Sequence, residues 1–167
     1  DIASRELEGL DLYETVAIGT LPERIDYDEN GARFAVSPGG GQKTGWFFDH
    51  RANRRRMLHE VEGKRVLDLF SYTGAWGIQA AVAGAREVLC VDSSQNALDR
   101  AQEHAELNGV SDRVSIRKGD VFDVLRDLRS GGEHFDVIVA DPPAFIRRKR
   151  DSTSGYEAYR RVNGLSM

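Results

Sequence analysis

Aspartates recur near the ends of apolar runs in this sequence. Asp68, Asp92, Asp120 and Asp141 each lie at such an end or a few residues beyond it. An ionised carboxylate attracts cations and accepts hydrogen bonds from hydroxyl and amino groups. If the runs are parallel strands of one sheet, these groups lie at the carboxyl ends of the strands, where α/β proteins bind ligands. The spacing therefore predicts a site for a ligand with hydroxyl and amino groups.

The turn after the first of these runs indicates which ligand is bound. A dinucleotide brings its pyrophosphate against a helix N-terminus, which requires glycines for close approach of the backbone. Residues 70–74 read FSYTG, with bulky side chains at those places, and Asp68 would repel a pyrophosphate. A carboxylate instead suits the ammonium group of S-adenosylmethionine. Asp92, 18 residues after Gly74, can accept both ribose hydroxyls of an adenosine, and Asp120 can accept the adenine amino group.

Each of these aspartates also has a purely structural explanation. Asp68 can cap the end of a strand, Asp92 can place its charge at a helix N-terminus, and Asp120 can be an N-cap. Their recurrence after three successive strands favours a shared ligand over three separate structural roles.

A rigid turn, Asp141-Pro142-Pro143, follows the last apolar run. Two prolines hold the backbone and remove two N–H donors, which leaves carbonyl groups free to face a ligand. Such a turn suits the amino group of a nucleic-acid base, and it would also serve as a rigid exit from a strand.

Two basic clusters are candidates for phosphate contacts. Since the net charge is −4, binding to nucleic acid must come from local patches of this kind. One cluster follows the Asp-Pro-Pro turn and the other lies on a helix predicted after a glycine hinge. The members of the first are Arg147, Arg148, Lys149 and Arg150. Those of the second are Arg51, Arg54, Arg55 and Arg56, of which Arg54 and Arg55 are the candidates for RNA contacts. A solvated loop explains the first cluster equally well.

Alternating strands and helices must position these residues. Asn30-Gly31 between alternating apolar and polar residues predicts a hairpin over 24–36. Further strands are expected at 64–70, 87–91, 113–117 and 135–140, and helices at 50–62, 75–83, 94–108 and 120–129. The last of these helices has apolar residues at i, i+3, i+4 and i+7. This order predicts an α/β fold with a Rossmann-like, doubly wound parallel sheet.

The composition restricts the class of protein. Cys90 is the one cysteine of the 167 residues, which excludes a disulfide framework and a thiolate metal cluster and fits a reducing cytoplasm. We expect no metal. No apolar run approaches the ~20 residues that span a membrane. Three glycines at 39–41 predict a boundary between a β-hairpin region over 1–40 and a ligand-binding domain over 41–167.

Five segments together resemble the PUA-containing type of 23S rRNA cytosine-5 methyltransferase. They are GQKTGWFFDHR at 41–51, VLDLFSYTG at 66–74, VDSS at 91–94, GDV at 119–121 and DPP at 141–143. This family consists of class I enzymes that use S-adenosylmethionine and release S-adenosylhomocysteine. Its members have an RNA-binding PUA domain, a small β-rich linking domain and a C-terminal catalytic domain. The resemblance implies a fragment that lacks the PUA domain and the end of the catalytic domain.

The resemblance also implies roles for particular residues. The walls of the cofactor pocket would be Lys43, Thr44, Phe48 and Arg51. The methionine end would be held by Asp68, Phe70, Tyr72 and Gly74. The ribose would contact Asp92 and Ser93, and the adenine Asp120 and Val121. The catalytic turn facing the target base of an rRNA partner would be Asp141, Pro142 and Pro143.

Methylation at C5 of cytosine requires a thiolate that adds to C6 of the base. Cys90 lies inside an apolar run, where a thiol is inert, and the family's nucleophile follows a later strand than those found here. We therefore expect no methyltransferase activity from this chain alone. Truncation would also leave the strand at 135–140 as an exposed apolar edge. We expect either that a partner, such as a second copy in a homodimer, buries this edge or that the monomer aggregates.

Other functions stay open. N-methylation of guanine in rRNA needs no thiol, because the amine lone pair attacks directly, and it suits an Asp-Pro-Pro turn. A non-catalytic RNA-binding module would keep the fold and use the basic clusters. A dehydrogenase is the least favoured function, because of the FSYTG turn.

Overall fold

The computed structural model describes residues 18–38, 46–146 and 152–166. The chain divides into two compact units, Asp1–Ile25 with Val36–Trp46 and Asp26–Ala35 with Phe47–Met167. The main sheet, its helices and the candidate site all belong to the second unit. The predicted domain boundary at residue 40 lies outside the described residues and stays a prediction.

A β-hairpin precedes the main sheet, as predicted. Strands β1 (Ile25–Glu29) and β2 (Ala32–Val36) pair with each other. Between them Asn30 and Gly31 have φ of 53° and 88°. A type I′ turn requires such left-handed values at both central residues, and asparagine and glycine adopt them at low cost.

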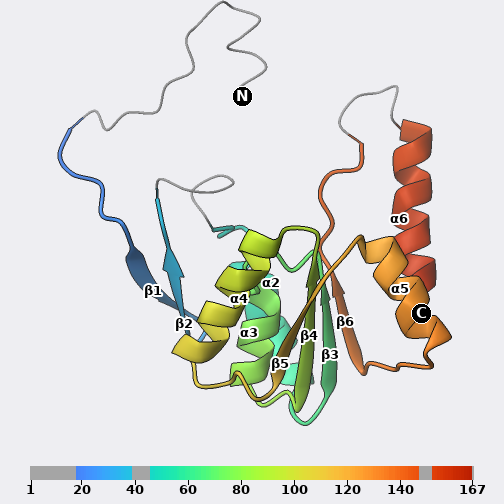
Figure 1. The fold of residues 1–167 in the computed structure, drawn as a ribbon, viewed down its shortest axis with the longest axis horizontal. Helices are drawn as coiled ribbons and strands as arrows, with labels where there is room; N and C mark the ends of the chain where they lie inside the picture. Colours follow the sequence, from blue (N-terminus) through green and yellow to red (C-terminus); the bar gives the residue numbers. More distant parts are fainter. Residues whose placement is uncertain (1–17, 39–45, 147–151, 167) are drawn as a thin grey trace, which may run out of the picture. The chain divides into compact units, whose positions relative to one another are not determined.

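Four parallel strands form the main sheet in the order β5-β4-β3-β6 (Figure 1). They are β3 (Arg65–Leu69), β4 (Glu87–Asp92), β5 (Val114–Lys118) and β6 (Val137–Ala140). The chain passes from β3 through β4 to β5 and then crosses to β6 on the other side of β3. This is the predicted doubly wound order, and its direction reverses beside β3, where such sheets bind ligands.

Helices cover both faces of the sheet (Figure 1). On one face lie α3 (Ala75–Val82) and α4 (Gln95–Leu107), with α2 (Arg51–Met57) beside α3, and on the other lie α5 (Val121–Ser130) and α6 (Ser152–Ser166). The helix predicted over 50–62 is shorter than expected, because the chain tightens into a 3-10 turn over Leu58–Glu60. Within the described ranges, no helix has the length and apolar character needed to cross a membrane.

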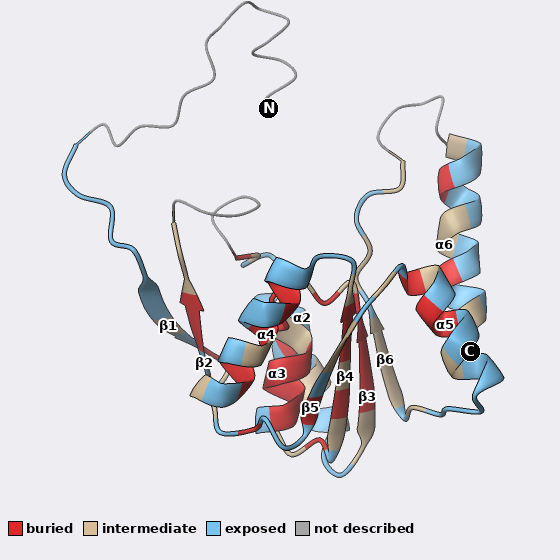
Figure 2. Ribbon diagram, in the orientation of Figure 1, coloured by how far each residue is buried: buried red, intermediate tan, exposed pale blue. Residues whose placement is uncertain are grey.

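The core beneath α5 holds that helix against the sheet (Figure 2). Its buried members are Leu67, Leu69, Val91, Val121, Val124 and Leu125. The helical spacing predicted for α5 is therefore confirmed, and Leu128 packs against the same cluster. Each fully buried aliphatic side chain contributes roughly 1.5–3 kcal/mol. This packing fixes the ends of β3 and β4, from which the candidate site is built.

Strand β6 is the outer strand of the sheet in the described part of the chain, where it pairs with β3 alone. Val137, Ile138 and Val139 are half-buried. The partner expected to cover this apolar edge stays a prediction.

Candidate functional site

The turn between β3 and α3 has an uncommon backbone conformation. Phe70 and Tyr72 have φ of 59° and 49°, and Gly74, the N-cap of α3, has φ of 78°. The left-handed region costs an aromatic residue about 1–3 kcal/mol. The N–H of Ser71 donates to the carbonyl of Val91 (3.0 Å), which ties the turn to the end of β4. Strain of this kind is concentrated at functional sites, so the turn is a candidate for ligand binding.

Asp68, near the end of β3, is completely buried. Its Oδ2 accepts the N–H of Gly77 in the first turn of α3 (2.9 Å), whereas its Oδ1 has no hydrogen-bond partner among the described residues. Burial raises the pKa of Asp68 to about 7; the Gly77 hydrogen bond opposes this rise, and the nearby Asp141 and Asp92 carboxylates add to it. An unpaired buried carboxylate oxygen costs free energy, which a cationic ligand group would recover. Asp68 is thus both a cap for α3 and a fit for the predicted ammonium group.

Gly77 lets α3 approach the sheet closely. A Cβ at this position would lie 2.6 Å from Sγ of Cys90 and 3.1 Å from Oδ2 of Asp68. Cys90 is buried, as expected, and burial followed by the charge of Asp68 raises the pKa of its thiol well above the usual value. Cys90 is therefore an inert packing residue.

Asp92 joins the turns that follow β3 and β4. Its Oδ2 accepts the N–H of Tyr72 (2.9 Å), and its Oδ1 accepts the N–H of Ser94 (2.9 Å). The carboxylate is half-buried, and each oxygen keeps a further lone pair. Asp92 can thus accept two ribose hydroxyls without losing these contacts. Ser93 lies exposed beside it.

Asp120 caps helix α5, so its structural explanation is confirmed. Its Oδ1 accepts the N–H groups of Phe122 (2.9 Å) and Asp123 (3.3 Å). The side chain of Val121 is 3% exposed and belongs to the core beneath α5. The contacts predicted between both residues and an adenine stay predictions, and those of Val121 would have to involve its backbone.

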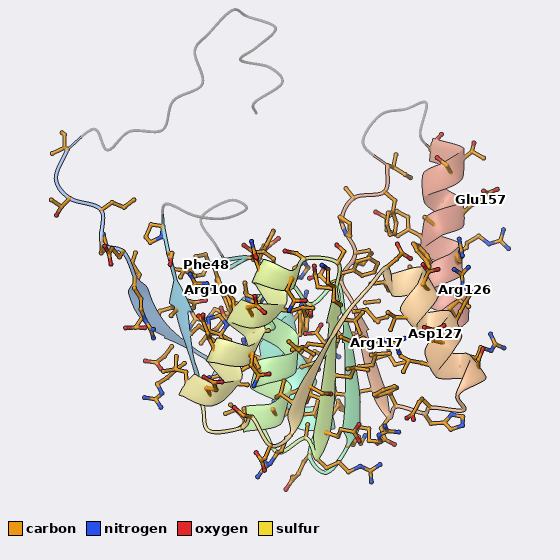
Figure 3. All side chains as sticks on the ribbon, viewed as in Figure 1. Phe48, Arg100, Arg117, Arg126, Asp127 and Glu157 are labelled. Atoms are coloured by element: carbon orange, nitrogen blue, oxygen red, sulfur yellow. The ribbon has the colours of Figure 1, made fainter. Side chains whose placement is uncertain are left out.

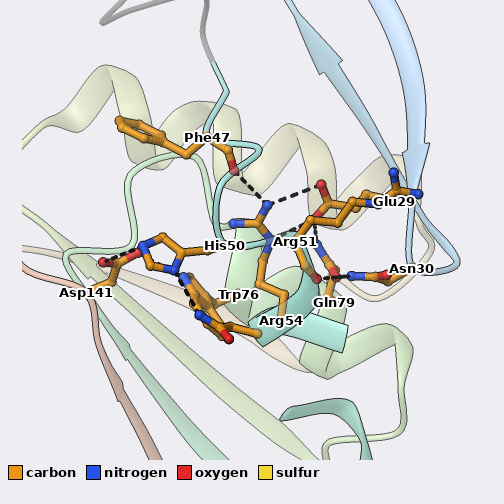
Figure 4. A network of polar contacts seen from close by, with 10 residues as sticks. Glu29, Asn30, Phe47, His50, Arg51, Arg54, Trp76, Gln79 and Asp141 are labelled. Carbon is orange, nitrogen blue, oxygen red and sulfur yellow. Dashed lines mark hydrogen bonds and ion pairs between the residues drawn. The ribbon is translucent and has the colours of Figure 1, made fainter. Parts of the chain in front are cut away.

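The Asp-Pro-Pro turn lies beside the first turn of α3. Oδ2 of Asp141 accepts the indole N–H of Trp76 (3.2 Å), and Oδ1 lies 3.7 Å from Nε2 of His50 (Figure 4). The side chain of Asp141 is 38% exposed, so a ligand can reach it. Pro142 is half-buried and Pro143 is exposed. The aromatic cluster that follows the turn consists of Phe70, Phe122, Phe145 and Tyr159.

The prediction that Arg54 binds RNA is wrong. This residue is 1% exposed, and its Nε and Nη2 donate to the two carboxylate oxygens of Glu29 (2.6 and 3.2 Å). Nη2 also donates to the carbonyl of Phe47 (2.7 Å), and Glu29 accepts a further bond from Gln79 (2.9 Å; Figure 4). Turning Arg54 toward a phosphate would break this buried pair, at a cost of several kcal/mol.

Three other predicted site residues lie on the surface, Phe48 just before α2 and Arg51 and Arg55 within it. Phe48 is 64% exposed (Figure 3), and its ring centroid lies 6.3 Å from that of Tyr27. Arg51 and Arg55 are exposed, and their predicted contacts stay predictions. The predicted residues outside the described part of the chain are Lys43, Thr44, Arg147, Arg148, Lys149 and Arg150.

Two residues that contact or approach the Asp-Pro-Pro turn were not predicted from the sequence. Trp76 and Asp141 are 65 positions apart, and the hydrogen bond between them depends on β6 pairing beside β3. The available signal was an indole two residues after the FSYTG turn, at the second position of α3. His50, the N-cap of α2, lies within the GQKTGWFFDHR segment, but no role was predicted for it.

Comparison with known proteins identifies the family. Residues 14–165 match the model of an S-adenosylmethionine-dependent methyltransferase family, and the chain belongs to that family. Over its whole length the chain is 40% identical to the ribosomal RNA large subunit methyltransferase I of Klebsiella pneumoniae and 44% identical to that of Aeromonas salmonicida. It spans 42% and 43% of the lengths of these relatives, which is less than half.

Solved structures of similar fold are also methyltransferases. A putative S-adenosylmethionine-dependent methyltransferase from Streptococcus mutans has a TM-score of 0.74 at 31% identity, over 92% of this chain and 40% of that one. A putative methyltransferase solved with S-adenosylhomocysteine has a TM-score of 0.74 at 28% identity, over 98% of this chain and 47% of that one. The predicted class I fold and S-adenosylmethionine as the cofactor of the family are confirmed.

Proposed function

We propose that this chain is the cofactor-binding part of an rRNA methyltransferase that modifies C5 of a cytosine in 23S rRNA. The observation that carries the proposal is an identity of 40–44% along the whole chain to proteins named ribosomal RNA large subunit methyltransferase I. The choice of cytosine C5 rests on the motif resemblance described above.

The residues around the FSYTG turn fit S-adenosylmethionine, which supplies a methyl group on a positively charged sulfur when bound. Asp68 would attract the ammonium group through its unpaired Oδ1, which no residue in the described ranges satisfies. Asp92 would accept the ribose hydroxyls while it holds Tyr72 and Ser94 in place. The strained turn would present its backbone to the ligand between them.

The Asp-Pro-Pro turn would hold the target base, with Asp141 accepting its exocyclic amino group. Attack from C5 of cytosine requires a thiolate at C6. Cys90 is buried and its thiol pKa is raised, so it cannot fill that role. We infer that the nucleophile comes from outside this chain and that the chain alone does not complete the reaction.

The first test is a calorimetric titration of the chain with S-adenosylhomocysteine, with NADH as the matched control. We expect saturable one-to-one binding of S-adenosylhomocysteine and no binding of NADH. A sample that is folded by circular dichroism and binds neither would contradict the cofactor site. If that sample still bound RNA with strong salt dependence, a non-catalytic RNA-binding module would be the better reading.

N-methylation of guanine is the second candidate function. Asp141 beside a proline-rich turn suits an exocyclic amine, and this chemistry needs no thiol. The chain, S-adenosylmethionine and 23S rRNA can be incubated together and the RNA analysed by nucleoside mass spectrometry. N-methylguanosine would support this candidate, whereas no product is expected if the reaction is at cytosine C5.

Location and assembly belong to the same proposal. Modification of rRNA would take place in the cytoplasm, and a homodimer would bury the apolar edge of β6. Sedimentation of the chain across a range of concentrations tests the second statement.

A further inference from the structure

Each carboxylate oxygen of Asp141 lies near a side-chain nitrogen, one from Trp76 and one from His50 (Figure 4). Trp76 donates its indole N–H to Oδ2 at 3.2 Å. On the other side, Asn53 donates from Nδ2 to Nδ1 of His50 (3.3 Å). Because Nδ1 then accepts, the proton of a neutral His50 is on Nε2, the nitrogen 3.7 Å from Oδ1 of Asp141. This distance is too long for a direct hydrogen bond, so Trp76 is the closer partner.

Two side chains lie close to the ring of Trp76. The ring of His50 lies 5.9 Å from that of Trp76 by centroids, and Cζ of Arg54 lies 5.8 Å from the Trp76 centroid. A guanidinium over an indole face is a favourable cation–π arrangement. Arg54 cannot move away, because its bidentate pair with Glu29 is buried.

The same buried pair connects this arrangement to the hairpin (Figure 4). Gln79 of α3 donates to Glu29 at the end of β1 (2.9 Å), and Asn30 of the hairpin turn donates to Gln79 (2.8 Å). A continuous set of contacts therefore runs from the hairpin through Arg54 and Trp76 to the carboxylate of Asp141. Few of these groups can shift without leaving a buried polar atom unpaired.

We propose that Trp76 and His50 are positioning residues that hold Asp141 as an acceptor and thereby select a base with an exocyclic amino group. The inference rests on the proposed function, because it takes Asp141 as the contact of the target base. Trp76 donates an N–H to Asp141 and His50 places a second N–H near it. An ionised carboxylate has no proton to donate, so the remaining lone pairs of Asp141 can only accept. Cytosine offers an amine at C4, whereas uracil offers a carbonyl there, and two acceptors that face each other cannot bond.

The test uses the chain saturated with S-adenosylhomocysteine and follows indole N–H resonances by NMR. The sequence holds two tryptophans, so Trp76→Phe assigns one resonance, and that of Trp46 is an internal reference. The probes are two matched pairs of nucleotides that differ at one amino group. Cytidine monophosphate is compared with uridine monophosphate, and guanosine monophosphate with inosine monophosphate.

We expect cytidine monophosphate to shift the Trp76 resonance and to bind about five-fold or more tightly than uridine monophosphate. Trp76→Phe keeps an aromatic ring but loses the N–H, and should weaken cytidine monophosphate binding about 2- to 12-fold. Its effect on S-adenosylhomocysteine affinity should be smaller. Tyr156→Phe, which removes a hydroxyl from an exposed ring on α6, is the matched control and should change neither affinity.

A conservative pair separates positioning from simple packing. His50→Gln keeps an N–H donor and should retain the preference for cytidine monophosphate, whereas His50→Leu should lose part of it. Equal affinity for both members of each nucleotide pair, or equal affinity in wild type and Trp76→Phe, would overturn this inference alone. So would a Trp76 resonance that no nucleotide moves. A folded chain that does not bind S-adenosylhomocysteine would overturn the proposed function as well.

Discussion

Charged residues are arranged differently at the two ends of the strands of the main sheet. We call these ends the amino edge, where the strands begin, and the carboxyl edge, where they end. At the amino edge, Arg65 donates from Nε to Glu87 (2.7 Å) and from Nη2 to Glu133 (2.9 Å), and its backbone N–H donates to Asp136 (2.8 Å). The hydrogen bond from Arg65 lowers the pKa of Glu87. Opposite charges at this edge are therefore paired with each other.

The carboxyl edge gathers charges of one sign. Asp68, Asp92 and Asp141 belong to three neighbouring strands or the turns that follow them, and the latter two help to raise the pKa of the first. Arg54, a cation near Asp68 among the described residues, is already paired with Glu29. The turn with two left-handed aromatic residues lies at the same edge.

This difference distinguishes the amino edge, whose charges contribute to stability, from the carboxyl edge, which is suited to a ligand. Paired charges and a backbone in ordinary conformations cost little free energy, so they need no special support from the surrounding structure. An unpaired buried oxygen and a strained turn persist only when the surrounding structure enforces them. Here that structure is the close packing at Gly77 and the buried Arg54–Glu29 pair.

The largest effect is expected when that buried pair is broken. Arg54→Ala breaks the buried pair with Glu29, and should lower the free energy of unfolding by about 3–5 kcal/mol. Urea unfolding followed by circular dichroism measures this. The double variant Arg54→Met with Glu29→Leu should recover most of the loss. A loss below about 1 kcal/mol for Arg54→Ala would show that the pair behaves like an exposed one.

Asp68 should give the carboxyl edge a pH dependence of opposite sign to that of Glu87 at the amino edge, whose pKa is lowered. Its pKa is about 7 in the folded chain against an ordinary 3.8, so between these values the folded state binds more protons than the unfolded state. The free energy of unfolding therefore falls as pH rises through this window and levels off above about 7. Relative to wild type, Asp68→Asn should gain on the order of 3 kcal/mol between pH 4 and 8. Urea unfolding at several pH values tests this, and parallel curves for the two proteins would contradict it.

Gly77→Ala tests how tightly the packing at the carboxyl edge is set. The added Cβ would meet Sγ of Cys90 at 2.6 Å, and overpacking of this kind costs about 1–3 kcal/mol. Gly164→Ala is the matched control, because that helical glycine has nothing within 4 Å of its added Cβ. The control should be neutral or gain up to about 1 kcal/mol. Thermal unfolding of both variants measures the contrast, and equal shifts would disprove it.

The smallest effect is expected at the amino edge. Glu133 is 45% exposed, and Glu133→Ala should cost about 0.2–1 kcal/mol, less at high salt. Affinity for S-adenosylhomocysteine should not change. A loss that matched Arg54→Ala, measured by the same urea titration, would abolish the distinction between the two edges.

Much of the fold could be predicted because it follows from local patterns. Asn30-Gly31 predicted the hairpin, and the apolar spacing of α5 predicted the face that packs on the sheet. The alternation of strands and helices predicted a parallel sheet that includes the strand at 135–140. The positions of Asp68 and Asp92 followed from the same patterns, since a residue at the end of a parallel strand must lie at the carboxyl edge.

Arg54 shows where this reasoning failed. In the sequence it lies beside Arg55 and Arg56, and nothing local distinguishes the three. Only Arg54 of these is buried, because the helix turns it toward Glu29, which lies 25 positions earlier in the chain. A residue's partner across such a distance is set by packing and not by its neighbours.

The sequence by itself thus determined the order of strands and helices, the turn that excludes a pyrophosphate, and the aspartates that lie near it. These are consequences of backbone geometry and side-chain periodicity, which act over a few residues. Tertiary structure alone decided that Oδ1 of Asp68 has no partner among the described residues and that Trp76 reaches Asp141. Burial and hydrogen bonding between distant segments depend on how β3, β6 and α3 come together, and no short stretch of the chain contains that information.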